Sequence, residues 1–302
     1  MTDDRHAAVC AVVVTHYPDS TVLQGLLASV SAQVGCVVVV DNSAEDMELP
    51  PGHADVTLIR QGRNGGLAQA QNVGLDWARQ HAFDYVLLLD QDSTPDDGMV
   101  CALLDALRRL GDSARVAAVG PRFHDVLEAR DAPFVKVGFP LNHKRWCDHP
   151  GQLLECDFLI SSGALIPLTV IDDIGSMDES LFIDNVDLEW SFRARARGYK
   201  LYGVCAAAMQ HQLGDSRRQL PFGLGQVIVH GPVRLYYIMR NRFRLYRLPH
   251  TPWIWVAQDM PRLAVKLFLF AAMIGPRARN IRFMLRGLWD GFRSKSGPCP
   301  LA

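Results

Sequence analysis

The first hundred residues alternate between short apolar runs and stretches with helical periodicity. The apolar runs are rich in β-branched and aliphatic side chains and lie at residues 8–15, 36–40, 56–60 and 85–89. Helical spacing of apolar residues occurs between them, at residues 21–33 and 67–81. Continuous apolar strands that alternate with helices are typical of a parallel sheet covered on both faces. The pattern therefore predicts an α/β fold.

Polar segments stand where the predicted strands end. They are residues 15–18, 41–42, 64–66 and 90–92. Asp and Asn are common in turns because their side chains bond to nearby backbone, so one such segment indicates little. Ligands of open α/β sheets, however, gather beyond the carboxyl ends of the strands. Four polar segments at one edge therefore predict a binding site there.

The pattern changes after Pro121. Residues 121–150 contain four prolines and three histidines, which favours a long loop or hairpin over the sheet. Strands are predicted again at residues 154–160, 164–166, 200–204 and 207–211, with a helix at 187–197 that Gly198 ends. From about Gln226 onward the sequence is helical, basic and aromatic. We expect an α/β domain over residues 1–214 and a helical region over 215–302.

Asp90 and Asp92 directly follow the apolar run 85–89. Two carboxylates at this spacing can share one hard divalent cation, which commonly bridges diphosphate oxygens and keeps several waters. Asp-rich turns without metal are frequent, so the neighbouring polar strand ends are what favour a metal site. The glycine turn at 64–66 leads into a helix whose backbone N–H groups can face a phosphate. Neither GxGxxG nor GxxxxGK[ST] is present, which argues against dehydrogenases and P-loop kinases.

Three carboxylates, Asp184, Asp187 and Glu189, stand at the start of the helix predicted at 187–197. Acidic residues in a first turn also suit the helix dipole. In a helix, Asp184 and Asp187 share a face, whereas Glu189 lies about 200° round from Asp187. A carboxylate that faces a cleft can act as a general base. At most one of Asp187 and Glu189 can contact a given substrate hydroxyl.

The chain of 302 residues has a formal net charge of −1 that hides two unlike parts. Residues 1–214 hold 16 basic and 29 acidic residues, whereas residues 215–302 hold 15 basic and 3 acidic ones. Such asymmetry favours an anionic partner for the basic end, although a solvated basic face is the alternative. The apolar content of 49% and the length are sufficient for a large buried core.

The seven cysteines are scattered with no CxxC pair, which favours reduced thiols over a disulfide framework or a zinc site. The first apolar run follows Asp3, Asp4 and Arg5 instead of a basic segment, so no signal peptide is expected. No run approaches the roughly 18 apolar residues of a membrane span. These features favour a cytoplasmic protein.

Eight stretches taken together resemble the family 2 glycosyltransferases, which are inverting enzymes of the GT-A fold, and most of all bacterial dTDP-rhamnosyltransferases. The stretches span residues 12–247 and read VVVTHYPDS, VVVVDNS, RNGGLAQAQNVGLDWA, DYVLLLDQDSTP, SSGALIP, LFIDNVDLEWSFRARARGY, QHQLGD and YYIMRNRFRLYR. The resemblance implies that residues 1–120 bind the nucleotide-sugar and that residues 121–214 bind the acceptor.

The resemblance also implies roles for the strand-end residues. Thr15 and Pro18 would shape the nucleotide pocket, and Asp41 would bind the pyrimidine base. Asn64 and Gly66 would lie near the sugar-nucleotide. His16 and Tyr17 stand where a Tyr-Asn pair is commoner in the family, which leaves the details of the base pocket open.

Asp90 and Asp92 match the DxD pair that places Mg²⁺ or Mn²⁺ on the diphosphate. His211 matches a histidine that often joins the metal or the diphosphate, although a single histidine is more often structural. Among the arginines of the run 240–244, some would contact the donor diphosphate, with Arg240 assigned to it, and others anionic lipid; surface charge is the alternative.

The family pattern for the base is an acidic pair ahead of a helical arginine. Counting back from Arg193 places the catalytic base on Asp187, with Val186 in place of the usual first acid. This departure keeps Asp184 and Glu189 as alternatives.

The implied activity is transfer of a sugar, L-rhamnose from dTDP-L-rhamnose, to a hydroxyl of a glycan or lipid-linked saccharide. The alternatives are another UDP- or dTDP-sugar and a nucleotide-binding module on the membrane without turnover. A nucleotidyltransferase is disfavoured because its glycine-rich basic loop is absent after the first strand. Residues 250–295 combine arginines with aromatic side chains and suit an anionic membrane surface. No nucleic-acid partner is expected, and a homo-oligomer stays open.

Overall fold

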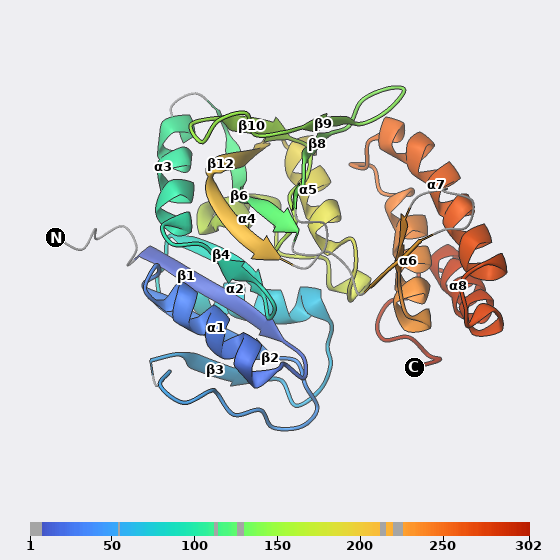
Figure 1. The fold of residues 1–302 in the computed structure, drawn as a ribbon, viewed down its shortest axis with the longest axis horizontal. Coiled ribbons are helices and arrows are strands. Elements are labelled where there is room, and N and C mark those ends of the chain that lie inside the picture. The colour runs from blue at the N-terminus through green and yellow to red at the C-terminus, as the bar shows by residue number, and fades with distance from the viewer. Residues whose placement is uncertain (1–7, 54, 112–113, 126–129, 212–215, 220–225) are drawn as a thin grey trace.

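A ten-stranded mixed sheet forms the centre of the molecule (Figure 1). The computed structural model describes residues 8–53, 55–111, 114–125, 130–211, 216–219 and 226–302. Within these residues the main path of the sheet has the order β10-β12-β6-β11-β4-β1-β2-β3. The fold class predicted from the sequence, a mostly parallel sheet flanked by helices, is confirmed.

The parallel half of the sheet comes from the first ninety residues. Its strands are β1 (Val9–Thr15), β2 (Cys36–Asp41), β3 (Thr57–Arg60) and β4 (Tyr85–Asp90). In the register of these strands, Val12 of β1 lies opposite Val38 of β2 and Leu88 of β4. The strand positions predicted from the apolar runs agree with the structure to within one residue.

The other half of the sheet is mixed. Strands β6 (Val116–Asp125) and β12 (Lys200–His211) are parallel, whereas β11 (Leu165–Pro167) runs antiparallel between β4 and β6. β10 (Leu153–Cys156) is antiparallel to β12; the two-residue strands β5 (Thr94–Pro95) and β7 (Arg130–Asp131) pair with β12 and β6.

Two predictions for this half need correction. The strands expected at 200–204 and 207–211 form the single strand β12, whose register against β6 shifts between Val204 and Ala208. The run 154–160 is a strand only as far as Cys156, because the N–H of the next residue, Asp157, donates to the carbonyl oxygen of Val135 at 2.9 Å instead of pairing with β12.

Helices cover both faces of the sheet. α1 (Ser20–Ser31) and α3 (Met99–Gly111) pack with Val9, Ala11 and Val13 of β1. α2 (Leu67–Gln80), α4 (Leu168–Ile174) and α5 (Val186–Ala196) pack with the alternate residues Cys10, Val12 and Val14. Successive side chains of a strand point to opposite faces, so the unbroken apolar run of β1 fills two cores.

The proline-rich segment at 121–150 contains a hairpin, as expected, formed by β8 (Phe134–Lys136) and β9 (His143–Arg145). Its tip reaches the C-terminal helices in Figure 1, where Gln258 donates a hydrogen bond to the carbonyl oxygen of Pro140 at 3.1 Å.

A disulfide joins Cys147, just after this hairpin, to Cys205 of β12. The expectation of reduced thiols is therefore wrong for this pair. The two cysteines are 58 positions apart in the sequence, and only the fold brings their Cα atoms to 5.6 Å. The other five cysteines are free.

The C-terminal region contains α6 (Pro232–Leu245), α7 (Trp253–Ala272) and α8 (Arg277–Phe292), which lie together at one end of the molecule in Figure 1. It becomes helical later than expected, because β14 (Gln226–Val229) first pairs with β13 (Ser216–Gln219). α8 packs closely on α6, since a Cβ atom at Gly287 would lie 2.4 Å from the carbonyl oxygen of Tyr236. Across the described ranges, we find no helix with the length and apolarity to cross a membrane.

Candidate active site

Hydrogen bonds join the carboxyl ends of the strands at one rim. The Thr15 hydroxyl at the end of β1 donates to Oδ1 of Asp41 at the end of β2, at 3.1 Å. The backbone N–H of His16 donates to Oε1 of Gln91, which follows β4, at 2.7 Å. The Asn64 amide approaches Nε2 of His16 to 3.1 Å. The four polar segments singled out in the sequence therefore meet.

Asp41 is buried and held by three donors. Its Oδ1 accepts hydrogen bonds from the Thr15 hydroxyl, from the Ser43 N–H at 3.2 Å and from the Ser43 hydroxyl at 2.8 Å. The same Ser43 hydroxyl oxygen accepts from the N–H of Tyr17 at 2.8 Å. These contacts fix the Asp41 carboxylate. Pro18, half-buried, follows at the entrance to α1.

The glycine turn before α2 is fixed by two asparagines. Asn42 donates from Nδ2 to Oδ1 of Asn64 at 3.1 Å and accepts from the N–H of Gly65 at 2.8 Å. Gly66 has φ of 93°, and a Cβ there would lie 2.6 Å from the carbonyl oxygen of Phe182. Only glycine combines this backbone conformation with this approach. The turn therefore touches the segment that leads into α5.

The turn after β4 carries Asp90 and Asp92. The N–H of Asp90 donates to the Ser162 hydroxyl at 3.1 Å, and the Ser162 and Ser93 hydroxyls lie 2.5 Å apart. Asp90 is half-buried, whereas Asp92 is exposed. β5, which follows this turn, pairs with the end of β12. The backbone of His211 therefore ends beside the turn; its side chain lies outside the described residues.

Two carboxylates of this kind fit a divalent cation that takes its other ligands from water and from a diphosphate. Among the described side chains there is no group of three or more His, Cys, Asp or Glu residues that would hold a metal by themselves.

Asp187 stands in the first turn of α5, close to the Asp90 turn. The N–H of Leu188 donates to its Oδ1 at 2.8 Å, and the backbone of Ser161 also bonds to the carboxylate. The pKa of the Asp187 carboxyl is raised to about 6, mainly by burial. The charges of Asp90 and Asp184 also raise this pKa, whereas the backbone hydrogen bonds from Leu188 and Ser161 lower it. A partly buried carboxylate with a pKa near neutrality is suited to accept a proton.

The other two carboxylates of this segment have different partners. Glu189 is 2% exposed, and both of its oxygens lie 2.9 Å from donor nitrogens of Arg193. This buried ion pair leaves Glu189 no free oxygen for a substrate. Asp184 accepts from Nε of Arg234 at 3.2 Å, and its buried Oδ2 has no hydrogen bond to the described residues. Burial raises the pKa of Asp184, while Arg234 opposes that shift.

Arg240 lies elsewhere than the sequence suggested. Its side chain is fully buried, and the guanidinium donates to the carbonyl oxygens of Leu181 at 2.7 Å and of Gly297 at 2.6 Å. The expected contact between Arg240 and a donor diphosphate therefore needs correction, because the hydrogen-bonding groups of the side chain face backbone carbonyls inside the protein.

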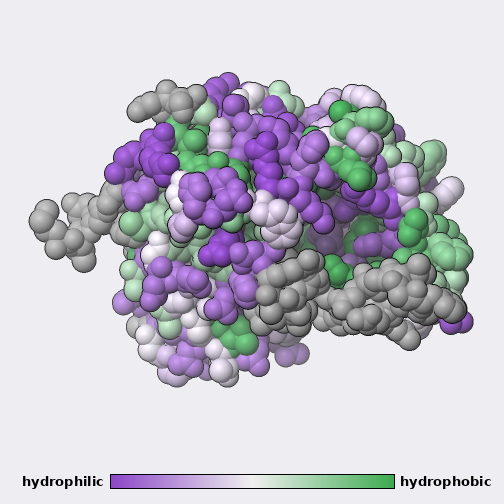
Figure 2. Space-filling view, turned by 45° about the horizontal axis from the view of Figure 1, so that its top comes forward, coloured by the Kyte–Doolittle hydropathy of each residue, from purple (hydrophilic) through white to green (hydrophobic). Residues whose placement is uncertain are grey.

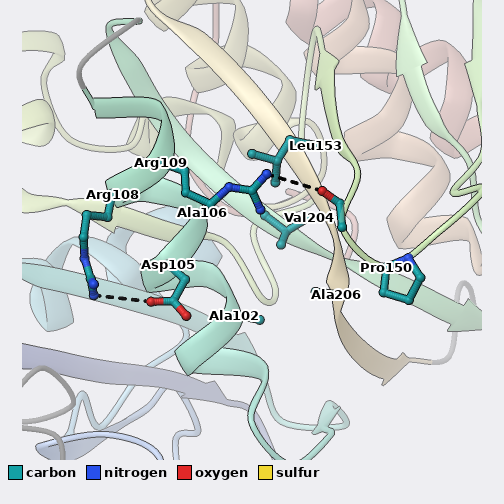
Figure 3. Close-up of a pocket in the computed structure, with 10 residues that line it drawn as sticks. Ala102, Asp105, Ala106, Arg108, Arg109, Pro150, Leu153, Val204 and Ala206 are labelled. Carbon is teal, nitrogen blue, oxygen red and sulfur yellow. Dashed lines mark hydrogen bonds and ion pairs between the residues drawn. The ribbon is translucent and has the colours of Figure 1, made fainter.

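A surface groove of about 490 Å³ lies away from this rim, between α3 and β12 (Figure 3). Its two arginines bond locally, Arg108 to Asp105 at 3.3 Å and Arg109 to the carbonyl oxygen of Gly151 at 3.5 Å. None of the residues expected in the active site lines this groove.

Comparison with known proteins identifies the family and the fold. Residues 11–160 match the family model described as glycosyl transferase family 2. The chain contains a family 2 glycosyltransferase domain. It is 29% identical, over 96% of its length and 97% of the relative, to the dTDP-rhamnosyl transferase RfbF of Shigella flexneri. It is also 22% identical to the low-salt glycan biosynthesis hexosyltransferase Agl10 of Haloferax volcanii, over 77% of this chain and 74% of that one.

Solved glycosyltransferases share the GT-A fold. A crystal structure of GalNAc-T7 with UDP, GalNAc and Mn²⁺ aligns with a TM-score of 0.60 and 13% identity, over 92% of this chain. Our chain spans 54% of that chain's length. Residues 1–349 of TarS from S. aureus, in complex with UDP-GlcNAc, align with a TM-score of 0.55 and 14% identity, over 95% of this chain and 81% of that one.

Several residues of this glycosyltransferase site were missed by sequence reasoning. Ser43 donates to the Asp41 carboxylate, Gln91 accepts from the N–H of His16, and Ser162 accepts from the N–H of Asp90. Arg234 pairs with Asp184. Ser43, Gln91 and Ser162 belong to motifs that carry the family resemblance, so their position was a signal although their partners were not. Arg234 lies outside those motifs, and only the packing of α6 reveals its contact.

The raised pKa of Asp187 predicts that the charged carboxylate destabilises the glycosyltransferase. Above about pH 6 the folded protein holds a desolvated charge, whereas well below pH 4 the carboxyl is protonated in both folded and unfolded states. Asp187→Asn should therefore have little effect on stability near pH 4 and should stabilise the protein above pH 6, by on the order of 3 kcal/mol. Thermal unfolding of metal-free protein from pH 4 to 8 measures this difference.

Asp97→Asn is the matched control, because Asp97 is an exposed carboxylate outside the rim. Equal stabilities of the parent protein and Asp187→Asn at every pH would contradict the raised pKa.

Proposed function

We propose that this glycosyltransferase transfers L-rhamnose from dTDP-L-rhamnose, with inversion, to a hydroxyl of a glycan or lipid-linked saccharide in the synthesis of a cell-surface polysaccharide. The observation that carries the proposal is the position of Asp187, a carboxylate with a pKa raised to about 6, beside the Asp90 turn. The donor sugar follows the similarity to RfbF, a dTDP-rhamnosyl transferase, along nearly the full length of both chains.

The rim would bind the nucleotide. Asp41, fixed by Thr15 and Ser43, presents a carboxylate that suits the N–H of a pyrimidine base. Asn64 and Gly66 line the neighbouring turn, where the sugar-nucleotide would lie. Pro18, just before α1, would border the bound nucleotide.

Asp90 and Asp92 would hold Mg²⁺ or Mn²⁺, and His211 would join them or the diphosphate. The half-buried and exposed positions of the two aspartates fit an ion that is open to water and phosphate oxygens. The Mn²⁺ and UDP in the GalNAc-T7 structure support this assignment. When bound, the cation supplies positive charge that stabilises the leaving diphosphate.

The proposed reaction is a single displacement. Asp187 takes the proton of an acceptor hydroxyl, whose oxygen forms a bond to the anomeric carbon. The bond from that carbon to the diphosphate oxygen breaks on the opposite face, and the nucleoside diphosphate leaves with the electron pair. Glu189 holds Arg193 and takes no part in proton transfer.

Another UDP- or dTDP-sugar is the alternative donor, and the UDP-GlcNAc complex of TarS supports keeping it. A nucleotide-binding module without turnover is the non-enzyme alternative. A panel of sugar nucleotides, with transferred sugar identified by mass spectrometry, distinguishes the three.

Asp187→Asn should lower transfer from the preferred donor by about 10²- to 10⁴-fold, because the amide cannot accept the proton. The Kd of the donor should stay within about threefold. Rates and donor binding are measured on the folded variant, with Asp97→Asn as the control. Near-parental transfer by Asp187→Asn would exclude Asp187 as the base.

Asp92→Ala should raise the concentration of Mn²⁺ that gives half-maximal activity by at least about tenfold, because one of two carboxylate ligands is lost. Metal titrations of the parent, of Asp92→Ala and of Asp97→Ala provide the measurement. The assignment fails if Asp92→Ala and Asp97→Ala respond alike.

The C-terminal region has a surface suited to an anionic membrane. Asp259 and Asp290 are the only acidic residues at 226–302, and both are buried. The exposed charged side chains there are thus basic. Large apolar side chains are exposed beside them on α7 and α8: Trp253, Met260, Val265, Phe268, Leu285, Trp289 and Phe292. Figure 2 shows hydrophobic surface at this end of the molecule. Such a mixture is typical of interfacial helices. We propose that these helices rest on anionic lipid.

Changing Arg277, Arg279 and Arg282 to Gln should weaken binding to anionic vesicles by about 100-fold, at roughly 1 kcal/mol per charge. Phe268→Ala should weaken it as well. Cosedimentation with phosphatidylglycerol-containing vesicles, compared with neutral phosphatidylcholine vesicles, tests this. Val22→Ala, at an exposed apolar position on α1, is the control. A parent protein that ignores anionic vesicles would end the proposal.

A further inference from the structure

The segment between η2 (Glu179–Leu181) and α5 has an unfavourable backbone conformation. Phe182, Asp184 and Asn185 have φ values of 67°, 63° and 64°. These are left-handed values, which L-residues other than glycine seldom adopt. Three such residues within four positions keep this shape only if the surrounding structure holds them. Asp187 follows two residues later.

Asn241 of α6 bonds to three carbonyl groups of this segment. Its Nδ2 lies 2.9 Å from the oxygen of Leu181, 2.7 Å from that of Ile183 and 2.9 Å from that of Asp184. Backbone carbonyl groups away from water need a hydrogen-bond partner, and the fully buried Asn241 side chain supplies one to each of these three. The two N–H bonds of one amide group are therefore shared among three carbonyl oxygens, one just before Phe182 and one on each side of Asp184.

Arg240 adds to the same contact. Its Nη2 donates to the oxygen of Leu181 at 2.7 Å and to that of Ser180 at 3.4 Å. Its Nε donates to Oδ1 of Asn241 at 3.0 Å, which orients the amide so that Nδ2 faces the carbonyls. Both side chains are fully buried.

The helix that carries these two residues is itself fixed. Arg240 also bonds to the oxygen of Gly297, and Gly291 of α8 lies so close that a Cβ there would be 2.8 Å from the oxygen of Arg240. Phe182 stacks on Tyr237 of the same helix, with ring centroids 5.0 Å apart. Phe182 also lies against Gly66 in the glycine turn before α2.

We infer that Arg240 and Asn241 are positioning residues, which hold the segment 181–185 in its left-handed shape and thereby aim the Asp187 carboxylate. The inference rests on the proposed role of Asp187 as the base. The contact between α6 and the segment that leads into α5 therefore affects catalysis, although neither side chain reaches the substrate.

Removal of the Asn241 side-chain amide should increase the conformational freedom of residues 181–185. In Asn241→Ala, kcat should fall by at least about 30-fold, because Asp187 is no longer held toward the acceptor, while the Kd of the donor changes less than threefold. Arg240→Lys keeps a donor but loses the fork, and it should reduce kcat by about fivefold to tenfold. Amide hydrogen exchange at residues 181–188 should accelerate in both variants.

Tyr246→Phe is the matched control, because it removes a hydrogen bond at the C-terminal end of α6, from the hydroxyl to Asp259 at 2.6 Å, that touches neither the segment nor Arg240. It should lower the Tm and leave kcat and the exchange of residues 181–188 at parental values. Kinetics are measured at least about 15 °C below each Tm, so that loss of folded protein does not lower the measured kcat. If Asn241→Ala does not fold, Arg240→Lys is used to test the inference.

Parental kcat in folded Asn241→Ala, or equal loss of kcat in Tyr246→Phe, would overturn the inference. Unchanged exchange at 181–188 in both positioning variants would overturn it as well. Retained transfer by Asp187→Asn would instead remove the base assignment. The exchange measurement does not depend on that role, so the two failures are distinguishable.

Discussion

The parallel pairing of β1 with β2 and β4 ends all three strands at one edge of the sheet. Thr15, Asp41 and Asp90 are far apart in the sequence, yet they become neighbours because Thr15 pairs with Asp41 and Val14 with Asp90. Both faces of β1 are buried, so a shift by one residue would exchange the side chains of its two cores. The same apolar packing that stabilises the sheet therefore determines which polar residues meet at the rim.

The three acids at the start of α5 differ in how far neighbouring groups compensate their charge. Glu189 is neutralised by two hydrogen bonds from Arg193, and Asp184 is paired with Arg234. Asp187 is buried near two further acids, and its pKa is raised to about 6. An enzyme that uses a carboxylate as a base needs one whose charge is poorly compensated, and such a group is a cost to stability.

The C-terminal helices contribute basic residues in two directions. Arg234, Arg240 and Arg242 point inward, where they pair with Asp184, backbone carbonyls and Asp259. Arg277, Arg279 and Arg282 are exposed. The positive charge of this region is therefore not one surface. The buried arginines connect α6 to the segment before α5. The exposed arginines form the surface that we propose contacts anionic lipid.

Much of the fold and the rim followed from local patterns. The apolar runs of β1, β2 and β4, and the polar residues at their ends, are each visible in a short window of sequence. The same holds for the glycine turn at Gly66 and for the start of α5. Periodicity and turn chemistry act over a few residues, so these features could be predicted without knowledge of the fold.

The contacts of Arg240, Glu189 and Cys147 could not be predicted in this way. Composition alone suits Arg240 to a diphosphate, but the packing of α6 buries it against Leu181. Cys147 and Cys205 have no motif spacing, and the hairpin brings them together. Local patterns in the sequence are enough to specify the α/β architecture and the glycosyltransferase family. Which charges are paired inside the protein follows from the packing of the fold, because that pairing depends on neighbours from distant elements and on the water they exclude.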